Sequence, residues 1–359
     1  MKSSSVHKGR GAVSNADGRY ESRTREVFDD GWGTLDEPLP SLKTSVLPDT
    51  ARTVISYNKS PDVGFDRSIN PYRGCEHGCI YCFARPTHTY LGLSAGLDFE
   101  TKLFAKFNAA ALLKKELSKP GYQCQPIALG INTDAYQPIE RELRITRQIL
   151  EVLSSCRHPL TIVTKSALVE RDIDLLAPMA EQSLVHVYFS VTTLDRKLAR
   201  TLEPRAAAPE RRIEALRNLA AAGIPAGVLV APTIPALTDT EMESILERCA
   251  EAGARSAGYV LLRLPLEIKD LFREWLETHE PGKAEHVMSL LRQAHGGKEY
   301  NAQFGTRMTG SGAYTEMIAQ RFKLACKRLG FNKHRSRLDT TKFQAPPVCE
   351  NQLTLFGER

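Results

Sequence analysis

The chain has 359 residues, of which 42% are hydrophobic and 25% are charged, and this composition is ordinary for a globular protein with one large core. No stretch approaches the ~20 apolar residues that a membrane-spanning helix requires, so we expect no membrane segment. The N-terminus lacks the apolar core of a secretory signal, and we therefore expect a cytoplasmic chain whose eight cysteines stay free of disulfides.

Residues 1 to about 50 are rich in Ser, Gly, Arg, Asp and Pro and show little periodicity, which predicts a flexible N-terminal arm. Further on, short apolar runs alternate with amphipathic segments, a pattern typical of parallel strands covered by helices. The apolar runs are continuous, as expected for strands that are buried on both faces. The expected strands are 67–70, 127–131, 160–163, 184–191, 226–231 and 258–262.

Apolar residues recur with helical spacing between these runs, most clearly around 145–156, 213–220 and 242–250. Gly223 and Gly253 follow the last two segments in the position of C-terminal caps. The pattern gives six β/α units and matches an α/β fold, the partial (β/α)6 barrel of the TIM type. We divide the chain into the N-terminal arm (1–50), the barrel (51–265), a basic helical region (266–343) and a flexible tail (344–359).

Three cysteines lie in one short loop, in the run CEHGCIYC at residues 75–82. A structural zinc site closes with four protein ligands, whereas a four-iron cluster held by three cysteines leaves one iron open. Gly74 and Gly78 would let this loop wrap tightly. The alternative is a nucleic-acid-binding module in which the loop holds zinc, with His77 or His88 as the fourth ligand.

The spacing CxxxCxxC, with Tyr81 directly before the last cysteine, resembles the cluster motif of the radical S-adenosylmethionine (radical SAM) superfamily. The resemblance implies an enzyme in which Cys75, Cys79 and Cys82 bind a [4Fe-4S] cluster and Tyr81 belongs to the catalytic site. It also implies that S-adenosylmethionine binds the open iron and is cleaved reductively to a 5′-deoxyadenosyl radical. Such an enzyme needs an electron donor such as flavodoxin or ferredoxin.

Polar residues follow the next three expected strands. Asn132, Thr133 and Asp134 come after the second strand, Lys165 after the third, and Ser190 ends the fourth. A zwitterionic cofactor with a ribose needs a cation for its carboxylate and hydroxyl or amide groups for its sugar, and barrels place such groups at the carboxyl ends of strands. We predict that these five residues contact S-adenosylmethionine; the alternative for each is ordinary hydrogen bonding within its loop.

Residues 70–239 also resemble the radical SAM branch related to spore photoproduct lyase, a group of DNA repair lyases, and within it an uncharacterised bacterial group. The shared features include Glu-Pro-Arg at 203–205 and Pro-Thr-Ile-Pro at 232–235. Two departures argue against transfer of the lyase reaction itself. The hydrogen-donating cysteine of the lyases is missing from residues 130–134, and Phe83 replaces the tyrosine that follows their third cluster cysteine.

Two features near the C-terminus suggest DNA or another nucleic acid as partner. The stretch 321–342 holds eight Lys and Arg residues against one Asp, interleaved with phenylalanines that could stack on bases; the alternative is a solvated helix face with core phenylalanines. The peptide QLTLF resembles the bacterial sliding-clamp-binding motif, in which Gln352 would be hydrogen-bonded while Leu355 and Phe356 fill a pocket; the alternative is a tail that folds back onto the barrel.

Overall fold

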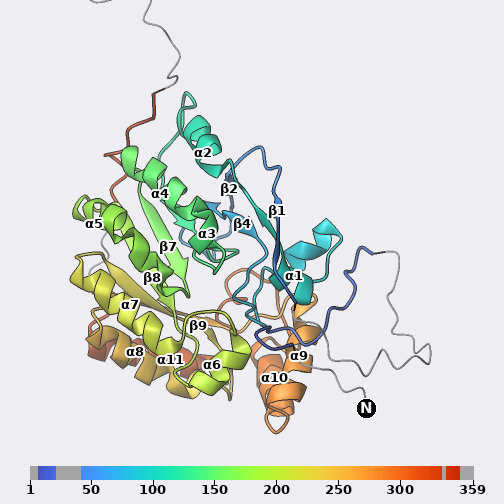
Figure 1. Ribbon diagram of the computed structural model, residues 1–359. Helices are drawn as coiled ribbons and strands as arrows, with labels where there is room; N and C mark the ends of the chain where they lie inside the picture. The colour runs from blue at the N-terminus through green and yellow to red at the C-terminus, as the bar shows by residue number, and fades with distance from the viewer. Residues whose placement is uncertain (1–6, 22–41, 334–336, 348–359) are drawn as a thin grey trace, which may run out of the picture.

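The computed structural model describes residues 7–21, 42–333 and 337–347, and Figure 1 shows an α/β fold built around one large sheet. Over these residues the sheet has the strand order β10-β9-β8-β7-β6-β3-β2. The parallel strands are β3 (Arg67–Ile69), β6 (Ile127–Leu129), β7 (Leu160–Thr164), β8 (Val185–Ser190), β9 (Ala226–Thr233) and β10 (Ser256–Leu261). The edge strand β2 (Ile55–Tyr57) runs antiparallel to β3. This sheet confirms the α/β fold and the six expected parallel strands.

The helices between the strands lie against the sheet, as Figure 1 shows for α5, α7 and α8, and their buried residues are mainly apolar. In α4, Ile149 and Leu153 are fully buried, in agreement with the helical spacing of the sequence. Gly223 and Gly253 have positive φ angles of 76° and 101°, which confirms them as helix caps. These helices are α2 (Ala109–Leu117), α3 (Glu140–Leu143), α4 (Ile145–Ser155), η3 (Ala167–Asp172), α5 (Ile173–Glu181), α6 (Arg196–Leu202), α7 (Pro209–Ala221), η4 (Asp239–Glu241) and α8 (Met242–Glu251).

A three-stranded sheet lies beside the barrel and borders the cysteine loop, residues 75–82. Its order is β1-β5-β4, with β4 leading directly into Cys75. After the cysteine loop, the chain returns to this sheet through two short helices. The segment that contains the loop therefore begins at β4 and ends at β5, which are neighbouring strands. The elements are β1 (Ser45–Pro48), β4 (Tyr72–Arg73), η2 (Arg85–Leu91), α1 (Leu97–Thr101) and β5 (Lys102–Ala105).

The N-terminal segment, residues 7–21, differs from the flexible arm expected over residues 1–50. Arg10, Ala12 and Val13 are buried, and Arg19 forms an ion pair with Glu267 at 2.8 Å. The low apolar content of this stretch predicted disorder. In the structure, however, the stretch packs against the protein, and Ala12 belongs to a buried hydrophobic cluster. Of the rest of the expected arm, residues 1–6 and 22–41 lie outside the described residues.

The C-terminal region is helical, with α9 (Ile268–His279), α10 (Ala284–Ala294) and α11 (Ala313–Leu329). The phenylalanines of the basic stretch pack inward: Phe322 lies 4.8 Å from the Tyr259 ring, and Phe331 is buried. Arg321 pairs with Glu243 on α8. These contacts agree with the alternative interpretation, a solvated helix face with core phenylalanines. The prediction that Phe322 and Phe331 stack on bases is therefore wrong.

The described chain ends in a segment, residues 337–347, that crosses the amino-terminal side of the barrel. The Gln344 amide donates to the Cys156 carbonyl at 2.8 Å, and the Phe343 ring lies 5.2 Å from that of His158. The clamp-like peptide, with Gln352, Leu355 and Phe356, lies outside the described residues. Among the described helices, none is both long and apolar enough to cross a membrane.

His158 makes the stability of this region pH-dependent. Its Nδ1 contacts the Pro159 carbonyl and its Nε2 contacts the Tyr122 hydroxyl, and burial lowers the pKa of His158 from 6.5 to about 4. Between pH 6.5 and 4 the unfolded chain binds a proton that the folded chain excludes, so stability falls as the pH is lowered. From pH 7 to pH 5 we expect His158 to cost about 2 kcal/mol, measured as the difference in urea-unfolding free energy. The His158→Gln variant should lose correspondingly less, and an equal pH-dependent loss in both proteins would contradict this origin.

Candidate active site

The cysteine loop lies over the carboxyl ends of three neighbouring barrel strands. After β6, Asp134 contacts His77 of the loop, with 3.4 Å between the carboxylate and Nδ1. After β7, the Lys165 ammonium lies 5.7 Å from the centre of the Tyr81 ring. After β8, the Thr192 hydroxyl lies 3.1 Å from the Tyr81 hydroxyl. The parallel pairing of β6, β7 and β8 therefore places the loop at the edge where barrels hold their functional groups.

The three thiols of the loop are shielded from water. Cys75 and Cys79 are buried and Cys82 is partly buried. Burial raises the pKa of each thiol, to about 12 for Cys79, so the thiolate forms need the compensating charge of a bound metal. Gly74 and Gly78 have positive φ angles of 78° and 67°, which confirms that they allow the tight path of the loop.

Arg85 holds the backbone of the cysteine loop from inside the protein. Its guanidinium is fully buried and donates to the carbonyl oxygens of Gly78 and Cys79 at 3.0 and 2.8 Å. The same guanidinium donates to Glu100, also fully buried, at 2.5 Å, so the charge of each partner is compensated. Two further bonds reach the carbonyls of Ala95 and Gly96. Sequence reasoning missed this pair, because nothing local distinguishes Arg85 or Glu100 from surface charges.

The N-terminal segment closes over the same carboxylate. The backbone amides of Gly11 and Ala12 donate to Glu100 at 3.0 and 2.9 Å. Gly11 is in such close contact with the loop that an added Cβ would lie 1.8 Å from the Gly78 carbonyl oxygen. Only glycine allows this approach, and no motif in the sequence points to it.

A second buried network extends from Tyr81. Its hydroxyl donates to Glu203, which also accepts from Thr192 and from the fully buried Arg212. Burial alone would raise the pKa of Glu203, but the Arg212 guanidinium and the Lys165 ammonium lower it to about 2. Burial is also the main cause that raises the pKa of Tyr81, so its phenol keeps its proton on Oη. The structure thus brings Tyr81, Lys165 and the Glu-Pro-Arg motif together.

The residues predicted to contact the cofactor differ in what their side chains do. Asp134 accepts from the Thr164 hydroxyl and the Lys165 amide at 2.8 and 2.7 Å, so it organises the strand ends. The Thr133 and Ser190 hydroxyls each donate to a backbone carbonyl, which leaves their oxygen lone pairs as acceptors. Asn132 is exposed, and only its backbone amide is bonded, to Asn70. The ammonium of Lys165 forms no ion pair with a carboxylate among the described residues.

Known proteins identify the class of this site. Residues 69–249 match the radical SAM superfamily. An uncharacterised protein of Mycobacterium tuberculosis is 37% identical over 305 residues, which cover 83% of this chain and 85% of its own length. An uncharacterised protein of Methanocaldococcus jannaschii is 32% identical over 245 residues, or 68% of this chain and 87% of its own.

The chain belongs to the radical SAM superfamily. Its fold is that of spore photoproduct lyase, also a radical SAM enzyme: a lyase complexed with dinucleoside spore photoproduct aligns with a TM-score of 0.58 at 16% identity, over 80% of both chains. A lyase variant with bound S-adenosylmethionine and the same lesion gives a TM-score of 0.56 at 15% identity, again over 80% of both. At these identities the likeness is one of fold.

Membership makes the chain a radical SAM enzyme and implies an iron–sulfur cluster and S-adenosylmethionine as cofactors. The donor set of the cysteine loop is compatible with a cluster. Among the described residues, no three His, Cys, Asp or Glu side chains converge tightly enough for a single metal ion, as structural zinc requires. A four-iron cluster binds each cysteine at a different iron, so its thiolates need not converge on one point. Membership in the radical SAM superfamily disfavours the zinc-stabilised binding module.

The contact between Gly11 and Gly78 predicts that the N-terminal segment stabilises the loop. In Gly11→Ala, the added Cβ should displace one of the two segments at a cost of about 1–3 kcal/mol, and reconstituted iron and sulfide should be lost to a chelator several-fold faster. The matched control is Gly64→Ala, since nothing lies within 4 Å of a Cβ at Gly64. Equal rates of cluster loss in both variants would show that the contact is not tight.

The Glu203–Arg212 pair gives a separate prediction about stability. Glu203→Gln leaves the buried Arg212 charge uncompensated, so we expect a loss of about 3 kcal/mol in the free energy of unfolding, measured by urea denaturation. Glu210→Gln removes the partner of Arg248 in an exposed ion pair between α7 and α8 and should cost below about 1 kcal/mol. A small and equal loss in both variants would mean that the network is hydrated.

Proposed function

We propose that this enzyme binds a [4Fe-4S] cluster through Cys75, Cys79 and Cys82, cleaves S-adenosylmethionine reductively and acts on DNA or another nucleic acid. The proposal rests mainly on the position of the three thiols. They are shielded from water and lie on one loop, which turns at two glycines and covers the carboxyl ends of parallel strands. Three thiolates leave one iron of a four-iron cluster without a protein ligand. When bound, the cluster supplies one electron to the sulfonium of S-adenosylmethionine, which splits into methionine and a 5′-deoxyadenosyl radical.

The strand ends supply groups suited to the cofactor. Lys165 carries the positive charge that the methionine carboxylate needs, and its position beside Tyr81 puts it next to the cysteine loop. Thr133, Ser190 and the exposed amide of Asn132 offer acceptors and donors for the ribose. Asp134 contributes by positioning, because its oxygens already bind Thr164 and Lys165. The burial of the loop excludes water from the site of radical formation.

Two observations support a nucleic acid as substrate. One structurally similar lyase is complexed with dinucleoside spore photoproduct. In this chain, Phe83 follows Cys82 directly, is 41% exposed, and has the Arg263 guanidinium 5.5 Å from its ring centre. An exposed aromatic ring and an arginine plane are the surfaces on which unpaired bases stack. We further propose a flavodoxin- or ferredoxin-like electron donor and a sliding-clamp contact through Gln352, Leu355 and Phe356.

The product is proposed only at the level of reaction class. Residues 130–134 contain no cysteine to donate hydrogen to a substrate radical, so the chemistry is repair-lyase-like without the lyase's own hydrogen donor. Tyr81 retains its phenolic proton in a bond to Glu203. Its role in this proposal is to line the site beside Lys165.

Anaerobic reconstitution tests the proposal. The wild-type chain should bind about four irons and four sulfides and release 5′-deoxyadenosine when reduced in the presence of S-adenosylmethionine. Cys79→Ala should lose the visible chromophore and the product while remaining folded. Cys249→Ala is the matched control, because Cys249 is a buried core residue of α8. Bound zinc without sulfide in the wild type, or full product release by Cys79→Ala, would refute the proposal.

A further inference from the structure

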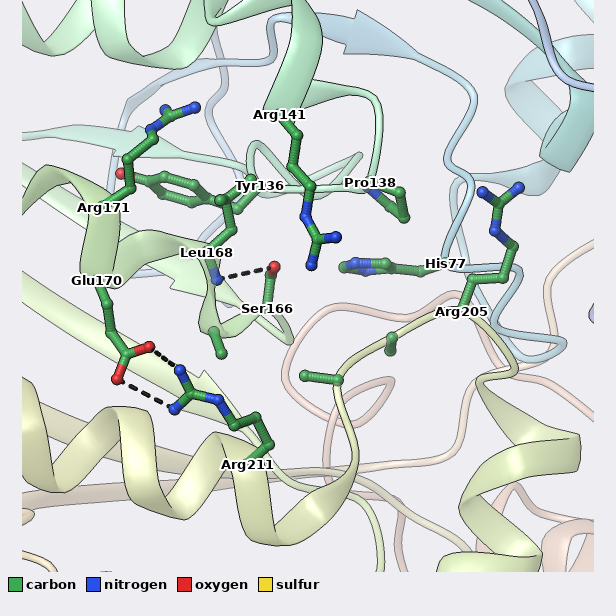
Figure 2. A pocket seen from close by; sticks show the side chains of 13 residues that line it. His77, Tyr136, Pro138, Arg141, Ser166, Leu168, Glu170, Arg171, Arg205 and Arg211 are labelled. Atoms are coloured by element: carbon green, nitrogen blue, oxygen red, sulfur yellow. Dashed lines mark hydrogen bonds and ion pairs between the residues drawn. The ribbon is translucent and has the colours of Figure 1, made fainter.

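A cavity of about 470 Å³ lies at the carboxyl ends of β6 and β7, beside the cysteine loop (Figure 2). Tyr136 and Pro138 line it from the segment after β6, and residues 166–168 together with Glu170 line it from the segment after β7. His77, which stands between two of the cluster cysteines, forms part of its wall. A group held in this cavity is therefore in contact with the cysteine loop.

The cationic side chains of this cavity are all arginines. Arg141, Arg171, Arg205 and Arg211 line it from four different segments, and the lining includes no lysine and one carboxylate, Glu170. A planar guanidinium binds phosphate through two parallel hydrogen bonds, whereas lysine acts as a point charge. The choice of arginine at each of these positions favours a planar or tetrahedral oxyanion as the ligand.

Three of the four arginines form ion pairs with carboxylates. Arg171 binds the buried carboxylates of Glu140 and Asp172, each at 2.9 Å. Arg211 pairs with Glu170, as the dashed lines in Figure 2 show. Arg211 thus compensates Glu170, the acidic residue of the cavity lining, so no unpaired carboxylate of the lining is left for another cation.

Of the other two arginines, Arg205 compensates the buried carboxylate of Glu76, and Arg141 carries a charge that no ion pair among the described residues balances. Arg141 has no side-chain partner among the described residues, and Figure 2 shows its guanidinium directed into the cavity between Ser166 and His77. Arg205 pairs with Glu76 at 2.9 Å and has one weak contact, at 3.4 Å, with Thr44. Arg141 therefore places an unpaired positive charge in this concave space, while the guanidinium of Arg205 is directed toward Glu76.

We propose that this cavity binds a phosphate group of the substrate, with Arg141 as the primary contact. The proposal rests on the nucleic-acid substrate proposed above and deepens it. The volume matches a pocket for a small ligand, on the scale of one nucleotide, and cannot admit a duplex. The substrate would therefore present a nucleotide held out of the helix or part of a single strand, as enzymes that modify bases require.

The carboxylate of S-adenosylmethionine is the other anion available near the loop. Lys165, the residue suited to that carboxylate, does not line the cavity. The arginine cavity and the lysine beside Tyr81 thus offer two separate anion sites on the two sides of one strand end. This separation assigns the cofactor to Lys165 and the substrate phosphate to Arg141.

The test is binding of a 5′-fluorescein-labelled single-stranded DNA to the reconstituted enzyme with S-adenosylmethionine present, followed by anisotropy over a range of salt concentrations. Arg141→Gln should weaken binding about ten-fold and reduce the slope of log K against log salt by about 0.7, the value for one lost contact to a single strand. Arg141→Lys should restore the salt slope but only part of the affinity. Sodium pyrophosphate should compete with the DNA in the wild type and less effectively in Arg141→Gln.

The matched control is Arg217→Gln. Arg217 is an exposed arginine of α7 outside the cavity, and its substitution removes the same net charge. Equal weakening in Arg141→Gln and Arg217→Gln, or no weakening in either, would overturn the phosphate site while leaving the nucleic-acid substrate in place. A wild type that cleaves S-adenosylmethionine but binds no DNA would instead overturn the substrate class. Loss of S-adenosylmethionine affinity in Arg141→Gln with unchanged DNA binding would reassign the cavity to the cofactor.

Discussion

The buried ion pair between Arg85 and Glu100 is the interaction on which the site depends. Arg85 fixes two carbonyls of the cysteine loop, and Glu100 uses its remaining capacity to bind the amides of Gly11 and Ala12. One pair of opposite charges therefore joins the loop, the small sheet and the N-terminal segment. Removing either partner would leave an unpaired charge with no exposure to water, so the pair specifies one position for the loop.

The second network sets the electrostatics on the barrel side of the loop. Glu203, Arg212 and Lys165 place two cations and one carboxylate around Tyr81, all close to Cys79. The excess positive charge suits a site that must receive three thiolates and a carboxylate. With the arginine cavity beyond His77, cationic groups lie on two sides of the loop, while the N-terminal segment covers another.

Sequence patterns predicted those features of the structure that depend on residues close together in the chain. Continuous apolar runs predicted five of the six parallel strands, and the cysteine spacing predicted the loop, because both signals lie within a few residues. The first strand, near residues 67–70, was expected from its place directly before the cysteine loop. The support of the loop could not be predicted, since Glu100 is 15 residues from Arg85 and 89 from Gly11 in the chain. The basic stretch shows the same limit: only packing reveals that Phe322 and Phe331 face the core while Arg321 pairs with α8.

Electron paramagnetic resonance of the reduced, reconstituted enzyme tests the central claim most directly, which is that three thiolates of the loop hold a cluster with one open iron. The account predicts the signal of a reduced [4Fe-4S] cluster that changes when S-adenosylmethionine is added, because the cofactor binds the iron that no cysteine occupies. A cluster signal that is identical with and without S-adenosylmethionine would contradict the account, as would a reconstituted protein with no cluster signal.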